Sequence, residues 1–212
     1  MTDNHHVTRS YGLLEGFLAK KRTHLTGRLI PERHRKGRIL DIGCGTHPYH
    51  LMNTVFFEKY GIDKSIREND YESLKKDNIF IKSFNIERED NLPFEDNYFE
   101  TITMLAVLEH IEPSHVSRII NDVFRILKDD GIFILTTPPP WTDRLLLIMA
   151  GLGLVSVTEI KDHKDTYKPE KIINLLQRAG FQRERVRYGY FEMFMNIWVA
   201  ARAAFFILVS CL

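Results

Sequence analysis

Short apolar runs alternate along the chain with longer stretches in which apolar residues recur at helical spacing. The runs predict strands that include residues 38–42, 61–63, 79–84, 99–105, 131–137, 181–187 and 196–203. The helical spacing predicts helices over residues 10–30, 114–127 and 167–179. A helix is also expected after the glycines at 43–45, with Leu51, Met52, Val55 and Phe56 in the core, and another from Ser65. Alternating strands and helices favour an α/β fold with a doubly wound parallel sheet and helices on both faces.

The chain has 212 residues, which suits one domain with a core large enough to fold alone. We divide it into an N-terminal cap helix and linker (1–37), a main domain (38–203) with an insertion at about 139–166, and an apolar C-terminal tail (204–212).

The total charge is nearly balanced, with 29 Lys and Arg against 28 Asp and Glu, so it does not indicate a nucleic-acid partner. Basic residues nevertheless gather at 20–38 and acidic residues at 87–112. The basic segment is interpreted as a solvated helix face, with a contact for an anionic substrate or cofactor carboxylate as the alternative. Two cysteines, Cys44 and Cys211, make no disulfide framework. With a polar start that lacks a signal peptide pattern, this favours the cytoplasm.

The most informative segment is an Asp-x-Gly-x-Gly motif, in which Asp41 precedes Gly43 and Gly45 at the end of the first apolar run. A strand followed by a glycine turn opens a nucleotide-binding unit, because glycine lets a ligand approach bare backbone. Pro48 stands where a dinucleotide fingerprint needs its third glycine. Asp63 ends the next predicted strand about 20 residues further on, where an acid can accept both ribose hydroxyls.

Five segments carry a resemblance to a known family: Ile39–Thr46, Gly61–Ser65, Phe84–Phe99, Thr103–Pro113 and Gly131–Pro138. In this order and spacing they resemble the class I S-adenosylmethionine-dependent methyltransferases related to the ubiquinone and menaquinone C-methylases, over roughly residues 38–200. The resemblance implies a Rossmann-like sheet of seven strands, mostly parallel with an antiparallel last strand. It also implies S-adenosyl-L-methionine as cofactor and S-adenosyl-L-homocysteine as product.

The same resemblance implies a set of cofactor-binding residues: Asp41, Gly43, Cys44, Gly45, Asp63, Lys64, Asn85, Ile86, Leu105 and Ala106. Two positions depart from the family pattern. His47 stands where the family often has glycine, which affects the methionine end of the cofactor, and Asn85 stands where it often has aspartate. An asparagine is a weaker acceptor for the adenine amino group.

The candidates for catalysis are His110, His163 and Tyr167. His163 and Tyr167 fall in the segment that commonly covers the methyl acceptor in this family, where either could orient or deprotonate a hydroxyl. The alternatives are an exposed histidine for His163 and a loop-shaping role for His110. Methyl transfer needs alignment and exclusion of water more than a general base, and no metal is expected.

Apolar residues dominate 141–157 and the tail at 204–212. Both segments are too short to span a bilayer. We expect a small, hydrophobic or quinone-like methyl acceptor, no nucleic-acid partner, and a tail that packs on the protein, on a second copy as a homodimer, or on a membrane surface. Three other functions remain open: a nicotinamide-dependent oxidoreductase, a non-catalytic S-adenosylmethionine-binding module, and an RNA methyltransferase that uses residues 20–38.

Overall fold

The first apolar run forms β1 (Arg38–Ile42), which lies inside a seven-stranded sheet. The structure is a computed structural model that describes residues 15–67, 77–142, 164–192 and 195–204. The strand order is β3-β2-β1-β4-β5-β7-β6. The other strands are β2 (Glu58–Asp63), β3 (Ile79–Ser83), β4 (Phe99–Leu105), β5 (Leu127–Thr137), β6 (Val186–Phe191) and β7 (Asn196–Arg202).

The sheet is parallel from β3 to β5, and β7 runs antiparallel to both of its neighbours. This confirms the prediction of a mostly parallel sheet with an antiparallel last strand. Ile42 pairs with Met104 of β4, and Leu105 pairs with Thr136 of β5, so these strands end at the same level. We call the edge formed by the C-terminal ends of β1, β2, β4 and β5 the carboxyl edge. In doubly wound sheets, ligands bind outside this edge.

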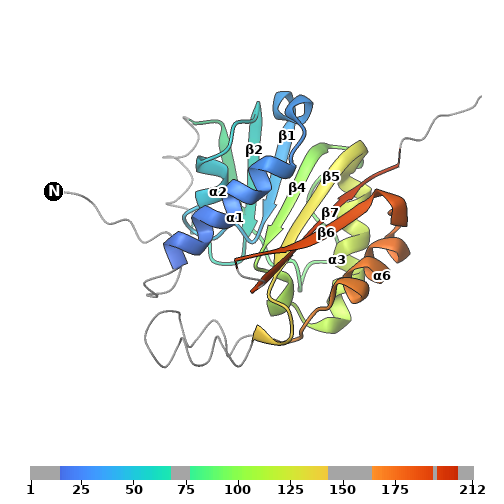
Figure 1. Cartoon of the computed structure of the whole chain (residues 1–212). Coiled ribbons are helices and arrows are strands. Elements are labelled where there is room, and N and C mark those ends of the chain that lie inside the picture. The colour runs from blue at the N-terminus through green and yellow to red at the C-terminus, as the bar shows by residue number, and fades with distance from the viewer. Residues whose placement is uncertain (1–14, 68–76, 143–163, 193–194, 205–212) are drawn as a thin grey trace, which may run out of the picture.

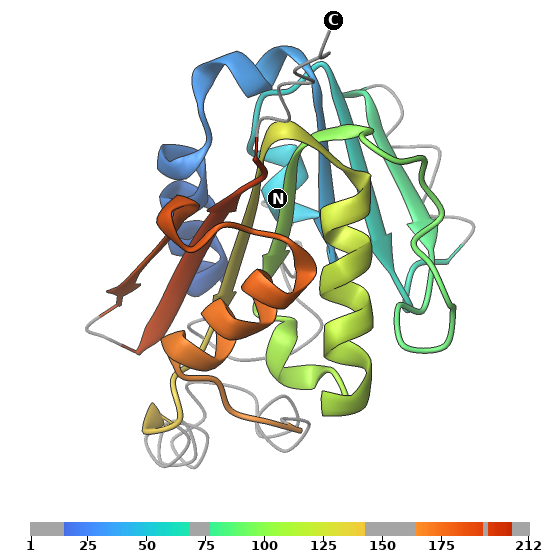
Figure 2. The same cartoon turned by 90° about the vertical axis from the view of Figure 1, so that its right-hand side faces the viewer.

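Helices cover both faces of the sheet (Figure 1). The helices α3 (Pro113–Ile126) and α6 (Pro169–Ala179) lie side by side on one face (Figure 2). The helices α1 (Glu15–Leu29) and α2 (Tyr49–Met52) lie on the other. Leu40 and Ile42 pack toward α3 and α6, whereas Ile39 packs toward α1 and α2. Alternation along β1 therefore places Asp41 on the α1/α2 face. Three short 3-10 helices complete the described chain: η1 (Glu32–Lys36), η4 (Leu108–His110) and η5 (Arg183–Arg185).

Two boundaries predicted from the apolar pattern are wrong. The helix after the glycine turn ends after one turn at Met52, and Val55 lies beyond it with 73% of its surface exposed. The strand predicted at 181–187 begins only at Val186, because Phe181 is buried against the ring of Phe124 directly after α6. In both places an apolar residue lies in a loop. Periodicity alone does not distinguish such a residue from an apolar residue of a helix or strand.

Several predicted features lie outside the described residues: the start of the first helix at 10–14, His163, most of the insertion at 139–166, and the tail from residue 205. Among the residues that are described, no helix is long and apolar enough to cross a membrane.

Candidate cofactor site at the carboxyl edge

The glycine turn after β1 has a backbone that other residues rarely adopt. Gly43 and Gly45 have φ values of 77° and 71°, in the left-handed region. The Gly43 N–H donates to the Ile62 carbonyl at 2.8 Å, which holds the turn against the end of β2. A Cβ on Gly43 would overlap the side chain of Val107, so both the turn and its packing require glycine here. The bare backbone predicted from the motif is therefore present.

Asp63 ties this turn to the end of β2. One carboxylate oxygen accepts the Gly45 N–H at 3.1 Å, and the other accepts the Ser65 N–H at 2.8 Å. Asp63 thus shapes the turn after β2, where residues 64–67 are not helical, and the rest of the helix predicted from Ser65 lies outside the described residues. This role of Asp63 is compatible with ligand binding, because each carboxylate oxygen can accept more than one hydrogen bond.

Asp41 lies buried under the turn, with only 5% of its surface exposed. Burial raises the pKa of its carboxyl group to about 7, and the nearby Asp63 adds to the rise, while a hydrogen bond from Thr103 opposes it. The Thr103 hydroxyl donates to the Asp41 carboxylate at 2.6 Å. A buried acid that titrates near neutrality becomes fully charged when a cationic group binds beside it.

The end of β4 supplies a second surface of the site. Ala106 has a φ of 55°, uncommon for a residue with a side chain, and its N–H donates to the Thr136 carbonyl at 3.0 Å. Leu105 and Ala106 are only partly buried, so they remain accessible at the carboxyl edge. Lys64 is exposed beside the turn, and the Cys44 thiol is buried within it.

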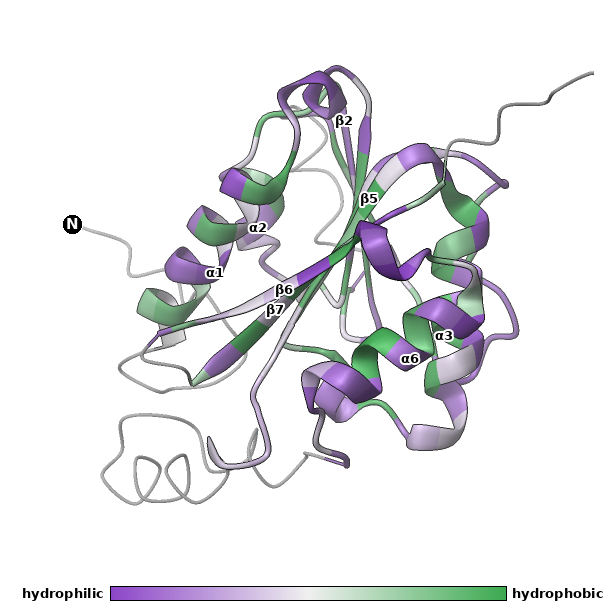
Figure 3. Cartoon of the chain, turned by 45° about the vertical axis from the view of Figure 1, so that its right-hand side comes forward, coloured by the Kyte–Doolittle hydropathy of each residue, from purple (hydrophilic) through white to green (hydrophobic). Residues whose placement is uncertain are grey.

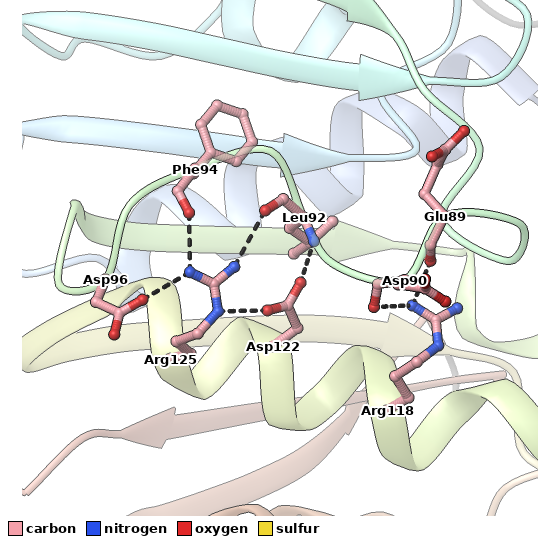
Figure 4. A network of polar contacts seen from close by, with 8 residues as sticks. All are labelled: Glu89, Asp90, Leu92, Phe94, Asp96, Arg118, Asp122 and Arg125. Atoms are coloured by element: carbon pink, nitrogen blue, oxygen red, sulfur yellow. Dashed lines mark hydrogen bonds and ion pairs between the residues drawn. The ribbon is translucent and has the colours of Figure 1, made fainter.

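The loop after β3 carries the two residues expected near adenine. The Asn85 side-chain oxygen accepts the Glu87 N–H at 3.0 Å, so it is already engaged in shaping the loop. Ile86 is partly buried against the core. Arg118 of α3 fixes this loop by donating to the Ile86 carbonyl at 2.7 Å. It also donates to the carbonyls of Glu89 and Asp90 (Figure 4).

A second arginine of α3 holds the next part of the same loop (Figure 4). Arg125 donates to the carbonyls of Leu92 and Phe94 at 3.0 and 2.9 Å, and pairs with Asp122 at 2.6 Å. Asp122 is buried and also accepts the Leu92 N–H. Neither arginine was expected from sequence, because their partners are backbone carbonyls that no residue pattern reveals.

The candidates for catalysis lie near the ends of β4 and β5. His110 is partly buried at the end of η4. Its neighbour Glu109 is buried and accepts a hydrogen bond from the Thr137 hydroxyl at 3.0 Å. The Lys164 N–H donates to the Glu109 carbonyl at 2.8 Å, which holds the chain before α6 against η4.

Tyr167 is buried in this same segment, with 1% of its surface exposed. Burial raises the pKa of its hydroxyl above the ordinary value, and the carboxylates of Asp165 and Glu109 add to the rise. The hydroxyl is therefore neutral at physiological pH, which suits it to orienting a partner rather than removing a proton.

A polar cluster in the β6–β7 hairpin was not expected from sequence. Glu192 has a φ of 52°, and one of its carboxylate oxygens accepts the Asn196 amide at 2.6 Å. Its other oxygen, like Nε of Arg22, is buried with no hydrogen-bond partner in the described part of the chain. Burial raises the pKa of Glu192, whereas Arg22 and Lys21 of α1 lower it. The cluster forms only when α1 lies near the hairpin, so no local signal could have revealed it.

No group of three or more metal-ligating side chains comes together within the ranges that the structure describes. The site there consists of a glycine turn, two acids on adjacent strands, and a loop fixed by arginines.

Comparison with protein families gives a match to a methyltransferase domain over residues 14–186. No curated protein matches the chain by sequence.

Solved structures with the same fold include several methyltransferases. An S-adenosylmethionine-dependent methyltransferase from Thermotoga maritima aligns with a TM-score of 0.65 and 20% identity, covering 90% of this chain and 91% of its own. One from Archaeoglobus fulgidus aligns with a TM-score of 0.65 and 16% identity, over 89% of this chain and 97% of its own. The phosphoethanolamine N-methyltransferase 2 of Haemonchus contortus, in complex with S-adenosyl-L-methionine, aligns with a TM-score of 0.63 and 14% identity, over 87% of this chain and 52% of its own. At these identities the likeness establishes the fold.

Proposed function

The chain belongs to the methyltransferase domain family and is an S-adenosylmethionine-dependent enzyme, and from this premise we propose that it methylates a small, hydrophobic acceptor. The observation that carries the cofactor assignment is the pair of left-handed glycines, Gly43 and Gly45, tied to Asp63 at the carboxyl edge. That arrangement leaves backbone and a carboxylate available where a nucleoside would lie.

The residues present fit this cofactor. Asp63 would accept the ribose hydroxyls, and the turn at Gly43, Cys44 and Gly45 would face the methionine part. Asp41 would balance the charge of the methionine ammonium, since its carboxyl group is buried and its pKa is raised to about 7. Five other residues would line the site: Lys64, Asn85, Ile86, Leu105 and Ala106.

Bound S-adenosylmethionine supplies a methyl group on a sulfonium, which is already a good leaving group. In-line displacement then requires mainly that the protein hold the acceptor in line and exclude water. His110 is the described candidate that an acceptor hydroxyl could reach. Tyr167 would have to become accessible to take the same role, because its side chain is buried. His163 is proposed for the same role from its place in the sequence.

The proposal of a hydrophobic acceptor rests on the apolar composition of residues 141–157, only the first two of which the structure describes. Trp141, at the start of this segment, is 53% exposed and follows β5 after three prolines. A large aromatic ring exposed near the carboxyl edge supports an apolar partner there. Glu192 and Asn196 add a polar group that could receive a hydroxyl or amine of the acceptor.

A transfer assay with S-adenosylmethionine labelled in its methyl group tests this function. We expect label to move into apolar, organic-extractable products when hydroxylated quinones and phenols are supplied, and not into RNA. Label found only in RNA would replace the proposal with an RNA methyltransferase. Binding of the cofactor without transfer to any acceptor class, including amines, would favour a non-catalytic binding module.

A fluorescence titration with NADH separates the remaining alternative. The proposal predicts that NADH does not bind saturably at the site that S-adenosylhomocysteine occupies. Tight NADH binding together with no binding of S-adenosylhomocysteine would indicate an oxidoreductase.

A further inference from the structure

The exposed residues of α1 lie on one side of the helix. Phe17, Lys20, Lys21, His24 and Arg28 are all exposed, and their spacing of three or four residues places them on one helical face. The segment from 16 to 31 contains no aspartate or glutamate. The outer face of α1 is therefore basic, with a phenylalanine near its beginning.

These cations differ from the basic residues that follow them in the chain. Arg33, Arg35 and Arg38 pair with Asp130, Glu32 and Glu58 respectively. The side chains of Lys20, Arg28 and Lys36 are exposed and have no ion pair or hydrogen bond with any residue that the structure describes. The basic segment thus divides into arginines that hold the fold together and cations whose charge is not balanced locally.

An exposed apolar loop lies next to the end of α1. Val55 and Phe57, which follow α2, are 73% and 64% exposed. Arg35 joins this loop to the helix: it donates to the Gly27 carbonyl of α1 at 2.8 Å, and its own carbonyl accepts the Phe57 N–H at 3.0 Å. The loop with Val55 and Phe57 is therefore attached to the last part of α1, through residues that are next in the chain to Arg28 and Lys36. The helix α1 itself lies on the outside of the described structure (Figure 3).

We propose that this surface, consisting of the outer face of α1, Lys36 and the loop with Val55 and Phe57, docks on an anionic phospholipid membrane. Anionic headgroups attract cations close to the surface, and the interfacial region accepts exposed apolar side chains. A nucleic acid would satisfy the cations and could stack a base on Phe57, but it would leave Val55 in water. The combination of both features therefore favours lipid. The proposal is independent of the methyl acceptor and of cofactor binding.

Flotation of the full chain with lipid vesicles tests this docking. The vesicles contain phosphatidylcholine alone, or phosphatidylcholine with phosphatidylglycerol as the anionic component, at low and high ionic strength. We expect flotation with the anionic vesicles that weakens as salt is added. Flotation that is absent, or equal with both compositions and unaffected by salt, would overturn the proposal.

Two matched variants locate the surface. Lys20→Glu/Arg28→Glu/Lys36→Glu reverses the unbalanced cations, whereas Lys82→Glu/Arg178→Glu/Arg187→Glu reverses three exposed cations on β3, α6 and β6. Both change the net charge equally. At roughly fivefold in partitioning for each cation, the first variant should lose on the order of 100-fold by the removal of three cations, and the introduced glutamates should add to this loss. The second should remain close to wild type. Equal losses in the two variants would show that only net charge matters and would overturn the assignment to this surface.

Two further measurements make the result specific. Val55→Ser/Phe57→Ser should float less while its salt dependence stays unchanged, and an unchanged partitioning would remove the loop from the surface. The milder Lys20→Gln/Arg28→Gln variant replaces the charge reversal if that one does not fold. A gel shift with a single-stranded RNA that depends on Lys20 and Arg28, without flotation, would overturn the proposal in favour of RNA.

Discussion

The two faces of the sheet bury very different chemistry. On the α3/α6 face, β4 contributes Ile102 and Met104 to a continuous apolar core, and the buried Asp122 is fully engaged by Arg125 and Leu92. On the α1/α2 face, the same strand contributes Thr101 and Thr103. Asp41 of β1 lies beside Thr103 there. One strand thus presents apolar residues to one helix pair and polar residues to the other.

The α1/α2 face also contains buried polar atoms that no described residue satisfies. Both ring nitrogens of His50 and the Thr26 hydroxyl are buried without a hydrogen-bond partner in the described chain. Such groups cost stability, so a fold selected for stability alone would not retain them. On the α3/α6 face, the Tyr167 hydroxyl is also buried without a partner among the described residues. Because more of these unsatisfied atoms lie on the α1/α2 side, we infer that the α3/α6 face is mainly the scaffold and that the α1/α2 face is the ligand face.

Asp122→Ala should produce the largest loss of stability, because it removes a buried acceptor on the scaffold face. Asp122 is 5% exposed, but its partner Arg125 is 31% exposed. Water can therefore solvate the arginine that is left behind, which makes the loss smaller than for a fully buried ion pair. We expect the free energy of unfolding to fall by about 2–4 kcal/mol in urea denaturation. Asp129→Ala, which removes an exposed acid at the start of β5, is the control and should change it by less than about 0.5 kcal/mol. Equal effects would remove the distinction between the faces.

His50→Leu should have the opposite sign, because it removes an unsatisfied buried group from the ligand face. Stability at neutral pH should rise by about 1–2 kcal/mol. Burial lowers the pKa of His50 to about 4, below its ordinary value of 6.5, so the unfolded chain binds the proton more readily. Wild-type stability therefore falls as pH drops from about 6.5 to 4, and the variant should lack this part of the loss. His24→Leu on the exposed face of α1 is the control; destabilisation by His50→Leu would contradict the account.

Asp41→Asn should change the pH profile in the other direction. The pKa of Asp41 is about 7 in the folded protein, against an ordinary value of 3.8 for an aspartate in water, so the folded state holds the proton more tightly. The stabilisation that comes from the tightly held proton is fully present below pH 3.8 and is lost as the pH rises to about 7. The asparagine variant should therefore show a smaller decrease in stability over this range. Identical profiles for variant and wild type would mean that Asp41 is not held in a low-dielectric site.

The sequence predicted the glycine turn and its neighbouring acids better than the surrounding loops. Glycines and acids placed at or directly after the ends of strands have few roles other than forming a ligand-binding turn. The structure brings four such residues together, Asp41, Gly43, Gly45 and Asp63. The limits of β4 also agree with the prediction, because its β-branched, aromatic and apolar residues are typical of a strand. These features depend on local chemistry, which a single sequence displays directly.

Contacts between distant segments could not be predicted in the same way. Arg118 and Arg125 resembled ordinary helix residues, since their partners are carbonyls of a loop about 30 residues away. The burial of Glu192 could not be predicted from its local sequence, because it depends on the distant helix α1. Val55 was placed in the core because exposed and buried apolar residues are identical in a sequence.

The central claim is that the glycine turn and Asp63 bind S-adenosylmethionine, and calorimetric titration of the wild type and Asp63→Ala tests it most directly. We predict micromolar affinity for the wild type and a loss of about 1.5–3 kcal/mol for the variant through lost charged hydrogen bonds. Asp129→Ala should bind like wild type, and thermal melting establishes that each variant is folded. Unchanged affinity in folded Asp63→Ala, or a wild type that binds S-adenosylhomocysteine no better than adenosine, would contradict the claim.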